Sequence, residues 1–388
     1  MSISKYRDLP SMVRGANLDL ACIDALSFRL QLIWLNRCPS HFFSRGRGRG
    51  HVYPDIEIGR ELGRGDGEVK ISFVSYATGA ETFRASHHEV IDLQLPENND
   101  YVETLVGASR VIGELRPDLI ISHEEFAVLP AARIAGVASI FLGAWLPPLN
   151  SIFASSLEAG SAILILEQPG IFPISDKLRS RTRYLGPVVR PLAYTRLDRQ
   201  KLRRQYGIGE DHLVISVMPG GWASEERVPI ASVVLAAFKL IEGPKVLHWV
   251  THHDHARLQR AAAEMDGVVV HRYHPCIEEL YAISDLVVTK GTYGITMEAA
   301  SLGVPTVSLS IGANPIDEIL VPRIKSNRSF HAASVTPAVL ATCFGEIRAM
   351  PSRALNLHQR GCAPVADAIT EIADQLCLRP SQAKRDPC

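Results

Sequence analysis

Short apolar runs alternate with longer amphipathic stretches along most of the chain, and this alternation predicts strands and helices in regular succession. The runs VKISFV, DLIIS, HLVISV and LVVTK are short and rich in β-branched residues, which favours buried strands. The stretch YVETLVGASRVIGEL instead spaces its apolar residues three and four apart, which predicts an amphipathic helix that ends before Pro117. Strands and helices that alternate in this way form parallel sheets with helices on both faces.

The same succession occurs twice, with an extended segment between the two copies. It runs from residue 41 to about residue 170, gives way to the proline-containing segment 184–191, and restarts near residue 213. The pattern predicts an α/β protein with two Rossmann-like domains that face a cleft. The predicted parts are an irregular N-terminal extension at 1–40, a first domain at 41–187, a linker at 188–200, a second domain at 201–345, and a closing helix and tail at 346–388.

The amino-acid composition limits which partners the protein is expected to bind and in which compartment it is expected to occur. The 388 residues carry 41 basic and 41 acidic side chains, so we expect no nucleic-acid partner. Seven scattered cysteines and the lack of a long apolar run predict reduced thiols and no membrane-spanning helix. Because the N-terminus also lacks the basic-then-apolar order of a signal peptide, we expect a cytoplasmic protein.

A glycine-rich loop follows the first expected strand, at residues 41–44. In this loop Gly48 and Gly50 precede His51, and the stretch DIEIGRELGRG that comes next has helical spacing. Alternating glycines let the backbone approach a ligand closely. The arginines between these glycines leave an RG-type nucleic-acid tail as the alternative, which the short run and the following helix disfavour.

Two further glycine loops occur in the second half of the chain. Gly220 and Gly221 follow the strand HLVISVM, and the loop KGTYG at 290–294 follows the strand LVVT and opens a helix that carries Glu298. Open α/β sheets bind ligands at the carboxyl ends of their strands, where backbone N–H groups and a helix N-terminus face an anion. We therefore expect an anionic ligand at these loops.

These residues resemble the GT-B fold of nucleotide-sugar glycosyltransferases. Within it they are similar to the branch that holds the lipid-linked peptidoglycan N-acetylglucosaminyltransferase and the UDP-glycosyltransferases. The similarity covers residues 41 to 330, and its most specific part is ELYAISDLVVTKGTYGITMEAASLGVPTV. The other stretches that carry it are GRGHVYP at 48–54, YLGPV at 184–188 and MPGG at 218–221.

The resemblance implies a role for each matched residue. Glu298 falls where the family's acidic residue holds the ribose hydroxyls of the donor. His51 falls on the family's histidine, which is the general base or a group that orients the acceptor. Asp317 and Glu318 occupy the acidic pair that touches sugar hydroxyls. The residues that would face the diphosphate or the sugar are Gly220, Gly221, Gly291, Thr292, Tyr293 and Gly294.

The chain departs from the family pattern at two places. The family has Ser-Gly-Gly or Ser-Gly-Ala where this chain has the loop 290–294, and Tyr293 is bulky for a phosphate-binding loop. A stacking or gating role for Tyr293 is the interpretation that follows. The acidic turn reads Pro-Ile-Asp-Glu where many relatives read Asp-Gln, which leaves the donor sugar open.

Residues outside the matched motifs add candidates. His123, Glu124 and Glu125 follow the strand DLIIS and face the cleft by topology, so they are candidates for acceptor contact, with helix capping as the alternative. His253 follows a strand of the second domain and would border the donor. The histidines of 252–255 lack the spacing of a metal site, and we predict no metal site. Lys290 would help to offset the leaving diphosphate charge, with a solvated strand-end lysine as the alternative.

The sequence therefore predicts an inverting, metal-independent transfer of a sugar from a nucleoside-diphosphate sugar, UDP-linked, to an acceptor hydroxyl. The nucleotide sugar is a co-substrate, and no cofactor is expected. A nucleotide-sugar 2-epimerase and a non-catalytic nucleotide-sugar-binding protein are the alternatives. The acceptor is open: a glycan, a lipid-linked sugar or a small molecule. A lipid-linked acceptor would need an apolar patch, and peripheral membrane contact is a prediction that rests on Phe141-Leu142, Trp145-Leu146 and Ile152-Phe153.

Overall fold

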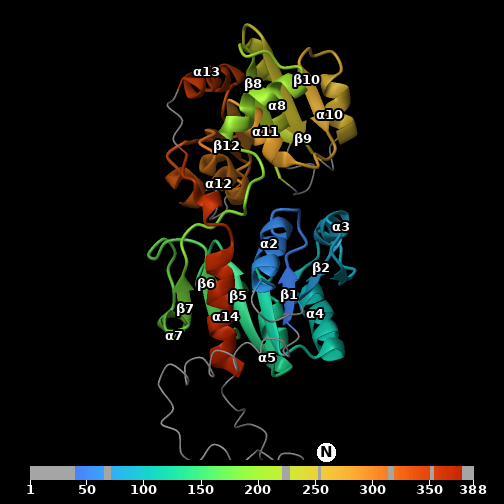
Figure 1. Cartoon of the computed structure of the whole chain (residues 1–388), viewed down its shortest axis with the longest axis vertical. Helices are drawn as coiled ribbons and strands as arrows, with labels where there is room; N and C mark the ends of the chain where they lie inside the picture. The colour runs from blue at the N-terminus through green and yellow to red at the C-terminus, as the bar shows by residue number, and fades with distance from the viewer. Residues whose placement is uncertain are drawn as a thin grey trace, which may run out of the picture.

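The computed structural model describes residues 40–64, 71–220, 228–251, 255–312, 319–349 and 354–377. The extension predicted at 1–40 lies outside these ranges except for Ser40. The described chain forms two α/β domains that are stacked along the long axis of the molecule (Figure 1). No helix in these ranges is both long and apolar enough to cross a lipid bilayer.

The first domain is built on a seven-stranded parallel sheet with the order β3-β2-β1-β4-β5-β6-β7. Its strands are β1 Ser40–Ser44, β2 Ile71–Ser75, β3 Val90–Asp92, β4 Leu119–His123, β5 Ala138–Gly143, β6 Ala162–Ile165 and β7 Thr182–Tyr184. Its helices are α2 Val52–Leu62, α3 Ala77–Ala85, α4 Tyr101–Leu115, α5 Val128–Ile134, α6 Ile152–Leu157 and α7 Asp176–Arg179. The strand order reverses direction between β1 and β4, and such a switch point is where open sheets bind ligands.

The two faces of this sheet are covered by different helices, as β1 illustrates. Successive side chains of a strand point to opposite faces. Phe42 packs in the core with Val52 of α2, whereas its neighbour Phe43 packs with Val111 of α4. Both phenylalanines are fully buried, and each burial contributes about 2 to 3 kcal/mol to stability. The apolar run HFF is therefore a central strand covered on both sides.

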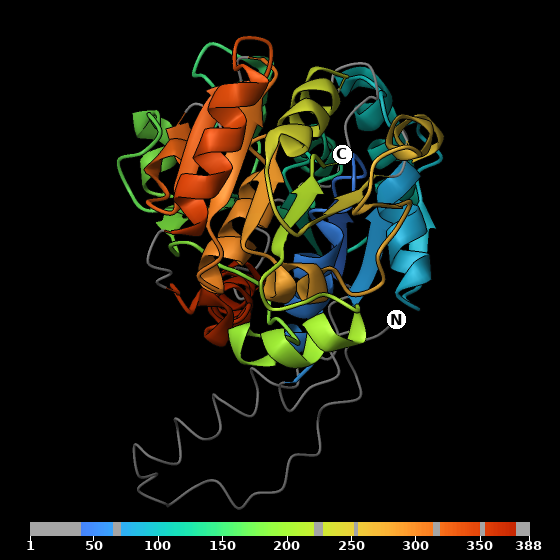
Figure 2. The same ribbon diagram turned by 90° about the horizontal axis from the view of Figure 1, so that it is seen from above.

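The second domain is built on a six-stranded parallel sheet with the order β10-β9-β8-β11-β12-β13. Its strands are β8 Leu213–Met218, β9 Lys245–Val250, β10 Val268–His271, β11 Leu286–Thr289, β12 Thr306–Ser310 and β13 Asn327–His331. Its helices are α8 Arg199–Gln205, α9 Val228–Leu240, α10 His255–Ala262, α11 Ile277–Ile283, α12 Tyr293–Ser301 and α13 Pro337–Arg348. Figure 2 shows α9 and α13 side by side on one face of this sheet, with α8 and α11 on the other. The second switch point lies between β8 and β11.

The last helix of the chain, α14 Ala363–Cys377, returns to the first domain, where it runs along the sheet in red (Figure 1). Val365 and Ile369 of α14 are buried in the same core as Val52 of α2. The two domains are therefore joined by two crossings of the chain, one before α8 and one before α14. Both crossings restrict how the domains separate.

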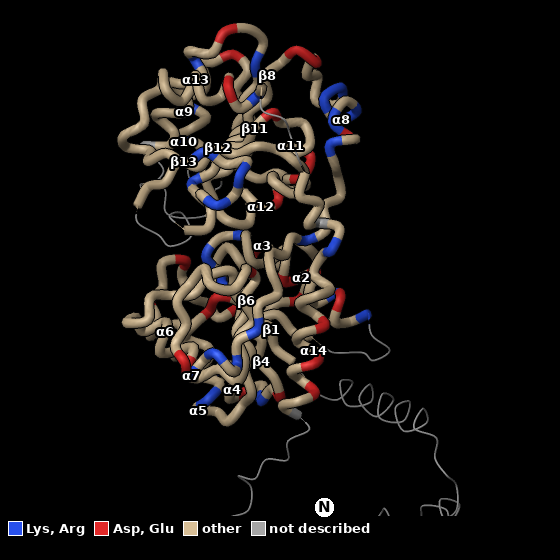
Figure 3. Tube along the Cα trace, turned by 90° about the vertical axis from the view of Figure 1, so that its left-hand side faces the viewer, with Lys and Arg blue, Asp and Glu red and all other residues tan. Residues whose placement is uncertain are grey.

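The basic helix α8 is anchored to the second domain by two of its arginines (Figure 3). Arg203 donates to the carbonyl oxygen of Ile283 at 3.0 Å, and Arg199 donates to that of Ser284 at 2.7 Å. Both guanidinium groups also pair with Asp285. These arginines satisfy carbonyl groups at the end of α11, where cations are favoured.

The predicted two-domain α/β architecture is confirmed, and local details differ. The segment Thr78-Gly79-Ala80, which follows the strand β2 closely, lies in the first turn of α3. The polar segment after Pro322 contains the strand β13, which the apolar pattern did not predict. The side chain of Asn327 explains that strand, because its amide oxygen accepts hydrogen bonds of 2.8 Å from the hydroxyls of Thr306 and Ser308 on β12.

Three histidines gather at the carboxyl ends of β9 and β10. His248 Nδ1 lies 3.0 Å from His271 Nε2, and the ring of His274 lies 5.3 Å from that of His271. Tyr206 closes the cluster with its hydroxyl 2.9 Å from His274 Nε2. Burial, together with the neighbouring imidazoles, lowers the pKa of His248 to about 4. The cluster is therefore stable only while these rings are neutral.

We expect acid to destabilise the protein through this cluster. His248 has a lower pKa in the folded state than in the unfolded chain, so its contribution is complete above about pH 6.5 and falls as the pH drops toward 4. Between pH 7.5 and 5.0 the loss is about 2 kcal/mol. Urea unfolding at the two pH values measures it, and His248→Gln should shrink the difference. An equal loss in wild type and His248→Gln, with the exposed His331→Gln as control, would contradict this assignment.

Candidate active site

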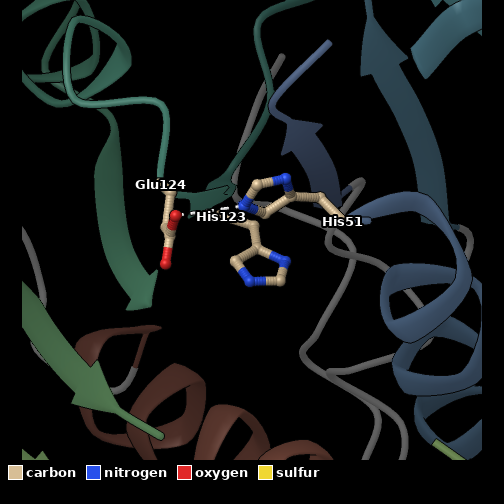
Figure 4. Close-up of side chains that lie close together, drawn as sticks. All are labelled: His51, His123 and Glu124. Atoms are coloured by element: carbon tan, nitrogen blue, oxygen red, sulfur yellow. Dashed lines mark hydrogen bonds and ion pairs between the residues drawn. The ribbon is translucent and has the colours of Figure 1, made fainter. Parts of the chain in front are cut away.

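At the first switch point, between β1 and β4, the loops that follow these two strands lie at the same edge of the sheet. β1 ends at Ser44 and leads into the glycine-rich loop, while β4 pairs with β1 and ends at His123. The neighbouring segments therefore converge: His51 comes from the first loop and Glu124 follows β4 directly. Figure 4 shows the side chains of His51, His123 and Glu124 grouped together.

His51 and Glu124 form a hydrogen-bonded pair. Nε2 of His51 lies 3.1 Å from Oε2 of Glu124, and Oε1 of Glu124 accepts a hydrogen bond of 3.0 Å from the N–H of Ala144. Glu124 is buried and its backbone has a φ of 55°, in the left-handed region that side chains rarely adopt. Strain of this kind is retained where the surrounding structure requires it, often at functional sites.

The pKa values of Glu124 and His51 are shifted by burial and by the contact between the two side chains. Burial acts to raise the pKa of Glu124, but the hydrogen bond and charge of His51, with help from His123 and Arg45, bring that pKa to about 2. Burial lowers the pKa of His51 even though Glu124 opposes the change. Glu124 is therefore ionised at neutral pH, and His51 is a neutral imidazole. His51 makes no capping hydrogen bond to α2, so a capping role does not explain it.

His123 lies on the other side of His51. The two rings meet edge to face at 4.6 Å, and Nδ1 of His123 lies 2.5 Å from Oδ1 of Asp55, a fully buried carboxylate on α2. Burial alone would lower the pKa of His123, but the charge and hydrogen bond of Asp55 raise it. His123 was a candidate from the sequence together with Glu124 and Glu125, whereas Asp55 was not. The missing signal was spatial, since α2 and β4 are far apart in the chain.

The side chain of Glu125 does not share the contacts of Glu124. Its carboxylate accepts a hydrogen bond of 2.9 Å from the hydroxyl of Tyr76, and its backbone carbonyl accepts one of 2.8 Å from Ser122. Burial raises the pKa of Glu125. The structure thus separates the two predicted acceptor-side carboxylates: Glu124 joins His51, whereas Glu125 fixes the turn after β4.

The glycine-rich loop is held close to α3. A Cβ on Gly46 would lie 2.3 Å from the carbonyl oxygen of Tyr76, so only glycine fits there. Gly48 has a φ of 81°, which also favours glycine, whereas a Cβ on Gly50 would meet nothing within 4 Å. The three arginines of this loop make contacts within the chain: Arg45 with Glu124, Arg47 with Asn99 and Arg49 with Tyr273. The loop is therefore an ordered part of the site, as its position before a helix predicts.

The second switch point brings the two predicted donor loops together. Gly220 has a φ of 81°, and a Cβ there would lie 3.0 Å from Oγ1 of Thr292 and 3.5 Å from Cε of Lys290. Gly291 has a φ of 95° and donates its N–H to the hydroxyl of Thr289 at 2.9 Å. A Cβ on Gly294 would meet nothing within 4 Å. Both loops thus present backbone at the N-terminus of α12.

Thr292 has the property expected of a ligand-binding group. It is the N-cap residue of α12, yet its side chain makes no capping hydrogen bond. Its Oγ1 is buried and has no hydrogen-bond partner among the described residues. A buried hydroxyl without a partner costs about 1 to 3 kcal/mol. An anion at this helix N-terminus would remove that cost.

Glu298 is paired with an arginine from the segment between the domains. Nε of Arg190 donates to Oε1 of Glu298 at 2.7 Å, and the same guanidinium group is bonded to Glu278. Oε2 of Glu298 is only weakly engaged, at 3.5 Å from Arg190. The guanidinium also lies over the ring of Tyr53 at 5.1 Å. Oε1 of Glu298 is thus held by Arg190, and the carboxylate also lies beside the buried hydroxyl of Tyr281.

Two curated relatives of this chain carry glycosyltransferase or transferase names. No protein-family model matches the chain. An uncharacterized glycosyltransferase of Methanopyrus kandleri is 24% identical over 229 residues, which cover 55% of this chain and 63% of that protein. The chain thus spans less than two thirds of this relative's length. A UDP-N-acetylglucosamine--N-acetylmuramyl-(pentapeptide) pyrophosphoryl-undecaprenol N-acetylglucosamine transferase of Finegoldia magna is 22% identical over 291 residues, 67% of this chain and 75% of that protein.

Solved structures share the two-domain arrangement. MurG of Acinetobacter baumannii has a TM-score of 0.58 at 14% identity, with 87% of this chain and 100% of that chain covered. A putative UDP-N-acetylglucosamine 2-epimerase of Listeria monocytogenes has a TM-score of 0.64 at 14% identity, with 86% and 94% covered. The fold is GT-B. Both the predicted fold class and the resemblance to GT-B glycosyltransferases are confirmed, while a fold shared by transferases and epimerases leaves the reaction to the site.

In this GT-B chain, residues from both domains meet around the site. The hydroxyl of Tyr53 lies 3.4 Å from that of Tyr273, and Arg49 lies over the Tyr273 ring at 4.4 Å. Tyr293, at the start of α12, donates to Glu167 at the end of β6 in the first domain. Tyr293 was predicted to stack or gate at the donor loop, and the structure adds a hydrogen bond that links this loop to the first domain.

Four of the predicted donor residues of the GT-B site, Gly221, His253, Asp317 and Glu318, lie outside the described residues. The roles assigned to them stay predictions. Arg190 is a further functional candidate that the sequence did not reveal, because a single arginine between Val189 and Pro191 carries no local signal. Its importance appears only where it meets Glu298 and Glu278.

Proposed function

We propose that the protein transfers a sugar from a UDP-linked donor to an acceptor hydroxyl, with inversion and without an essential metal. The observation that carries the proposal is the neutral His51 held by the ionised Glu124 beside the contacts between the domains. Residues on either side of His51, Arg49 and Tyr53, touch Tyr273 of the second domain. A base on the first domain thus faces the domain that carries the donor loops.

His51 suits the role of general base. When its Nε2–H donates to the Glu124 carboxylate, the lone pair is on Nδ1, which is buried and has no hydrogen-bond partner among the described residues. Nδ1 takes the proton of the acceptor hydroxyl as the acceptor oxygen bonds to the anomeric carbon. The bond from that carbon to the donor diphosphate breaks on the opposite face, so the configuration inverts. Glu124 stabilises the imidazolium that forms.

The donor side supplies positions for the nucleotide. Oε2 of Glu298 accepts from the ribose hydroxyls while Arg190 holds Oε1. The hydroxyl of Thr292 and the N-terminus of α12 bind the diphosphate, and Lys290 lies beside the same loop. These groups and Lys290 offset the charge of the leaving UDP. The UDP part of the donor is proposed from the resemblance and from a relative whose name includes UDP-N-acetylglucosamine, while the donor sugar stays open.

Binding of UDP tests the donor site directly. We expect millimolar UDP to raise the melting temperature, and Glu298→Gln to weaken UDP binding at least tenfold, because a neutral amide is a weaker acceptor and no longer pairs with Arg190. Thermal shift and isothermal titration measure the two effects. Glu264→Gln, an exposed change in the same domain, is the matched control. If UDP leaves the melting temperature unchanged, the donor assignment is wrong.

A nucleotide-sugar 2-epimerase is the second candidate, because the structure of one such protein overlaps this chain with a TM-score of 0.64. Incubation with UDP-N-acetylglucosamine alone separates the two functions, since an epimerase needs no acceptor. Turnover without acceptor would favour the epimerase. Tight donor binding without turnover across a panel of acceptors would favour the non-catalytic binding protein.

Exposed apolar residues on the first domain are relevant to whether the acceptor is lipid-linked. Of the predicted patch residues, Phe141, Leu142 and Leu146 are buried in the core, so they do not contribute. Ile152 and Phe153 of α6 are exposed, as is Leu149 just before this helix. Val102 and Val106 of α4 are also exposed, and the ring of Tyr101 on the same helix lies 6.0 Å from that of Phe153. We propose that these residues contact a lipid-linked acceptor or the cytoplasmic membrane face peripherally.

A further inference from the structure

We propose that His51, His123 and Glu124 form a binding site for a divalent transition-metal ion of the zinc type, and that metal binding switches the base off. The binding itself is independent of the reaction. Only the inhibitory consequence rests on the proposed function.

The geometry of the three side chains fits such an ion. One ligand atom from each residue lies within 4.8 Å of the other two. Nε2 of His51 and Oε2 of Glu124 are 3.1 Å apart, close to the separation of about 3.3 Å between two tetrahedral ligands with bonds of about 2.0 Å. Two imidazoles and a carboxylate, with a fourth position open, are one of the ligand sets that zinc uses in proteins. An ion therefore replaces the proton that these two atoms share.

The surrounding residues orient the ligands. Asp55 binds Nδ1 of His123 at 2.5 Å, so Nε2 is the nitrogen of His123 that would bind an ion. A carboxylate behind a histidine is the usual support of a metal-binding imidazole. The N–H of Ala144 holds the other oxygen of Glu124 at 3.0 Å. The side chains of His123 and Glu124 are thus held in place by other residues in the absence of a metal.

Arg45 opposes the metal. One of its terminal guanidinium nitrogens lies 3.8 Å from the same Oε2 of Glu124 that would bind the ion. Two cations near one carboxylate oxygen repel each other. The affinity is therefore set by Arg45 as well as by the ligands, and removal of this charge should strengthen metal binding.

The consequence for the reaction follows from the imidazole of His51. A metal on Nε2 forces the remaining ring proton onto Nδ1, so the lone pair proposed to accept the acceptor proton is lost. The metal also takes the carboxylate that would stabilise the imidazolium. The donor loops of the second domain are not involved. Zinc should therefore stop transfer without weakening UDP binding.

Titration of the metal-free full chain with ZnCl₂ tests the site, and Co²⁺ absorption reports a tetrahedral geometry. We expect His123→Asn, whose amide still donates to Asp55, to weaken Zn²⁺ binding at least tenfold. Arg45→Gln should tighten it several-fold, which misfolding cannot mimic. His331→Asn, an exposed histidine, and His271→Gln, in the separate histidine cluster, should change nothing. Unchanged binding in both His123→Asn and Arg45→Gln, or loss in His271→Gln, would overturn the site.

A second measurement separates this inference from the proposed function. Saturating Zn²⁺ should leave the UDP thermal shift intact and abolish transfer. Loss of the UDP shift on zinc addition would contradict a site confined to the first domain. If the zinc-free protein does not bind UDP at all, the proposed function fails, while the zinc titrations still decide the metal site.

Discussion

His51→Ala is expected to lower kcat for sugar transfer by about 10²- to 10⁴-fold while UDP binding stays unchanged, as is typical when a general base is removed. The ring of His51 is the only one of the described candidates that is both held by an ionised carboxylate and neutral, with Glu124 at 3.1 Å. UDP affinity should persist because the donor contacts of Glu298 and Thr292 lie in the other domain.

The comparison needs kcat measured at saturating donor, together with UDP titration of each variant. Glu124→Gln should give an intermediate loss, because its amide does not stabilise the imidazolium as a carboxylate does. His212→Ala, a partly exposed histidine of the second domain, is the control for the loss of any imidazole. A His51→Ala enzyme that keeps more than a tenth of the wild-type kcat would remove His51 from the catalytic role.

Arg190→Met is expected to destabilise the protein by about 3 to 5 kcal/mol, the usual cost when one partner of a buried ion pair is removed. Arg190 is buried between Glu278 and Glu298, and the two carboxylates raise its pKa despite burial. Without the guanidinium, two largely buried carboxylates face each other with no compensating charge. The stacking of Arg190 on Tyr53 is lost as well.

Urea unfolding of the whole chain measures this effect. Arg183→Met is the matched control, because Arg183 pairs with Glu371 at the surface, where an ion pair contributes about 0 to 1 kcal/mol. Adding Glu278→Gln to Arg190→Met should recover part of the stability by removing one unpaired charge. Equal costs for Arg190→Met and Arg183→Met would show that the buried network contributes no more to stability than a surface ion pair.

The UDP titration of Arg190→Lys adds a functional readout. A lysine keeps the charge but cannot bind Glu298 and Glu278 with a planar fork. We expect it to weaken UDP binding more than it weakens folding, because Glu298 is then held less firmly. This outcome would mark Arg190 as a positioning residue for the donor site.

The strand and helix pattern was readable from the chain because parallel sheets bury both faces of their strands. Short runs such as LVVT and HLVISV, separated by amphipathic stretches, have few other structures available to them. The glycine loops were readable for a related reason. Gly48, Gly220 and Gly291 all have positive φ, and a conformation that favours glycine leaves its mark on the sequence.

Charge networks were not readable in the same way. Arg190, Asp55 and His123 have no neighbours in sequence that indicate what they contact. Their partners, such as Glu298 for Arg190 and Asp55 for His123, lie 108 and 68 positions away. A local pattern reports burial and turn geometry, but it cannot report which charges meet when two distant elements pack.

The sequence by itself determined two α/β domains and the loops at their strand ends. It also indicated His51 and Glu298 as candidates near those loops. Tertiary structure alone decided that Glu124 rather than Glu125 meets His51, that Asp55 orients His123, and that Arg190 holds Glu298. The physical reason is that backbone preferences and apolar periodicity act over a few residues, whereas the pairing of buried polar groups is set by which loops the sheet topology brings to one edge.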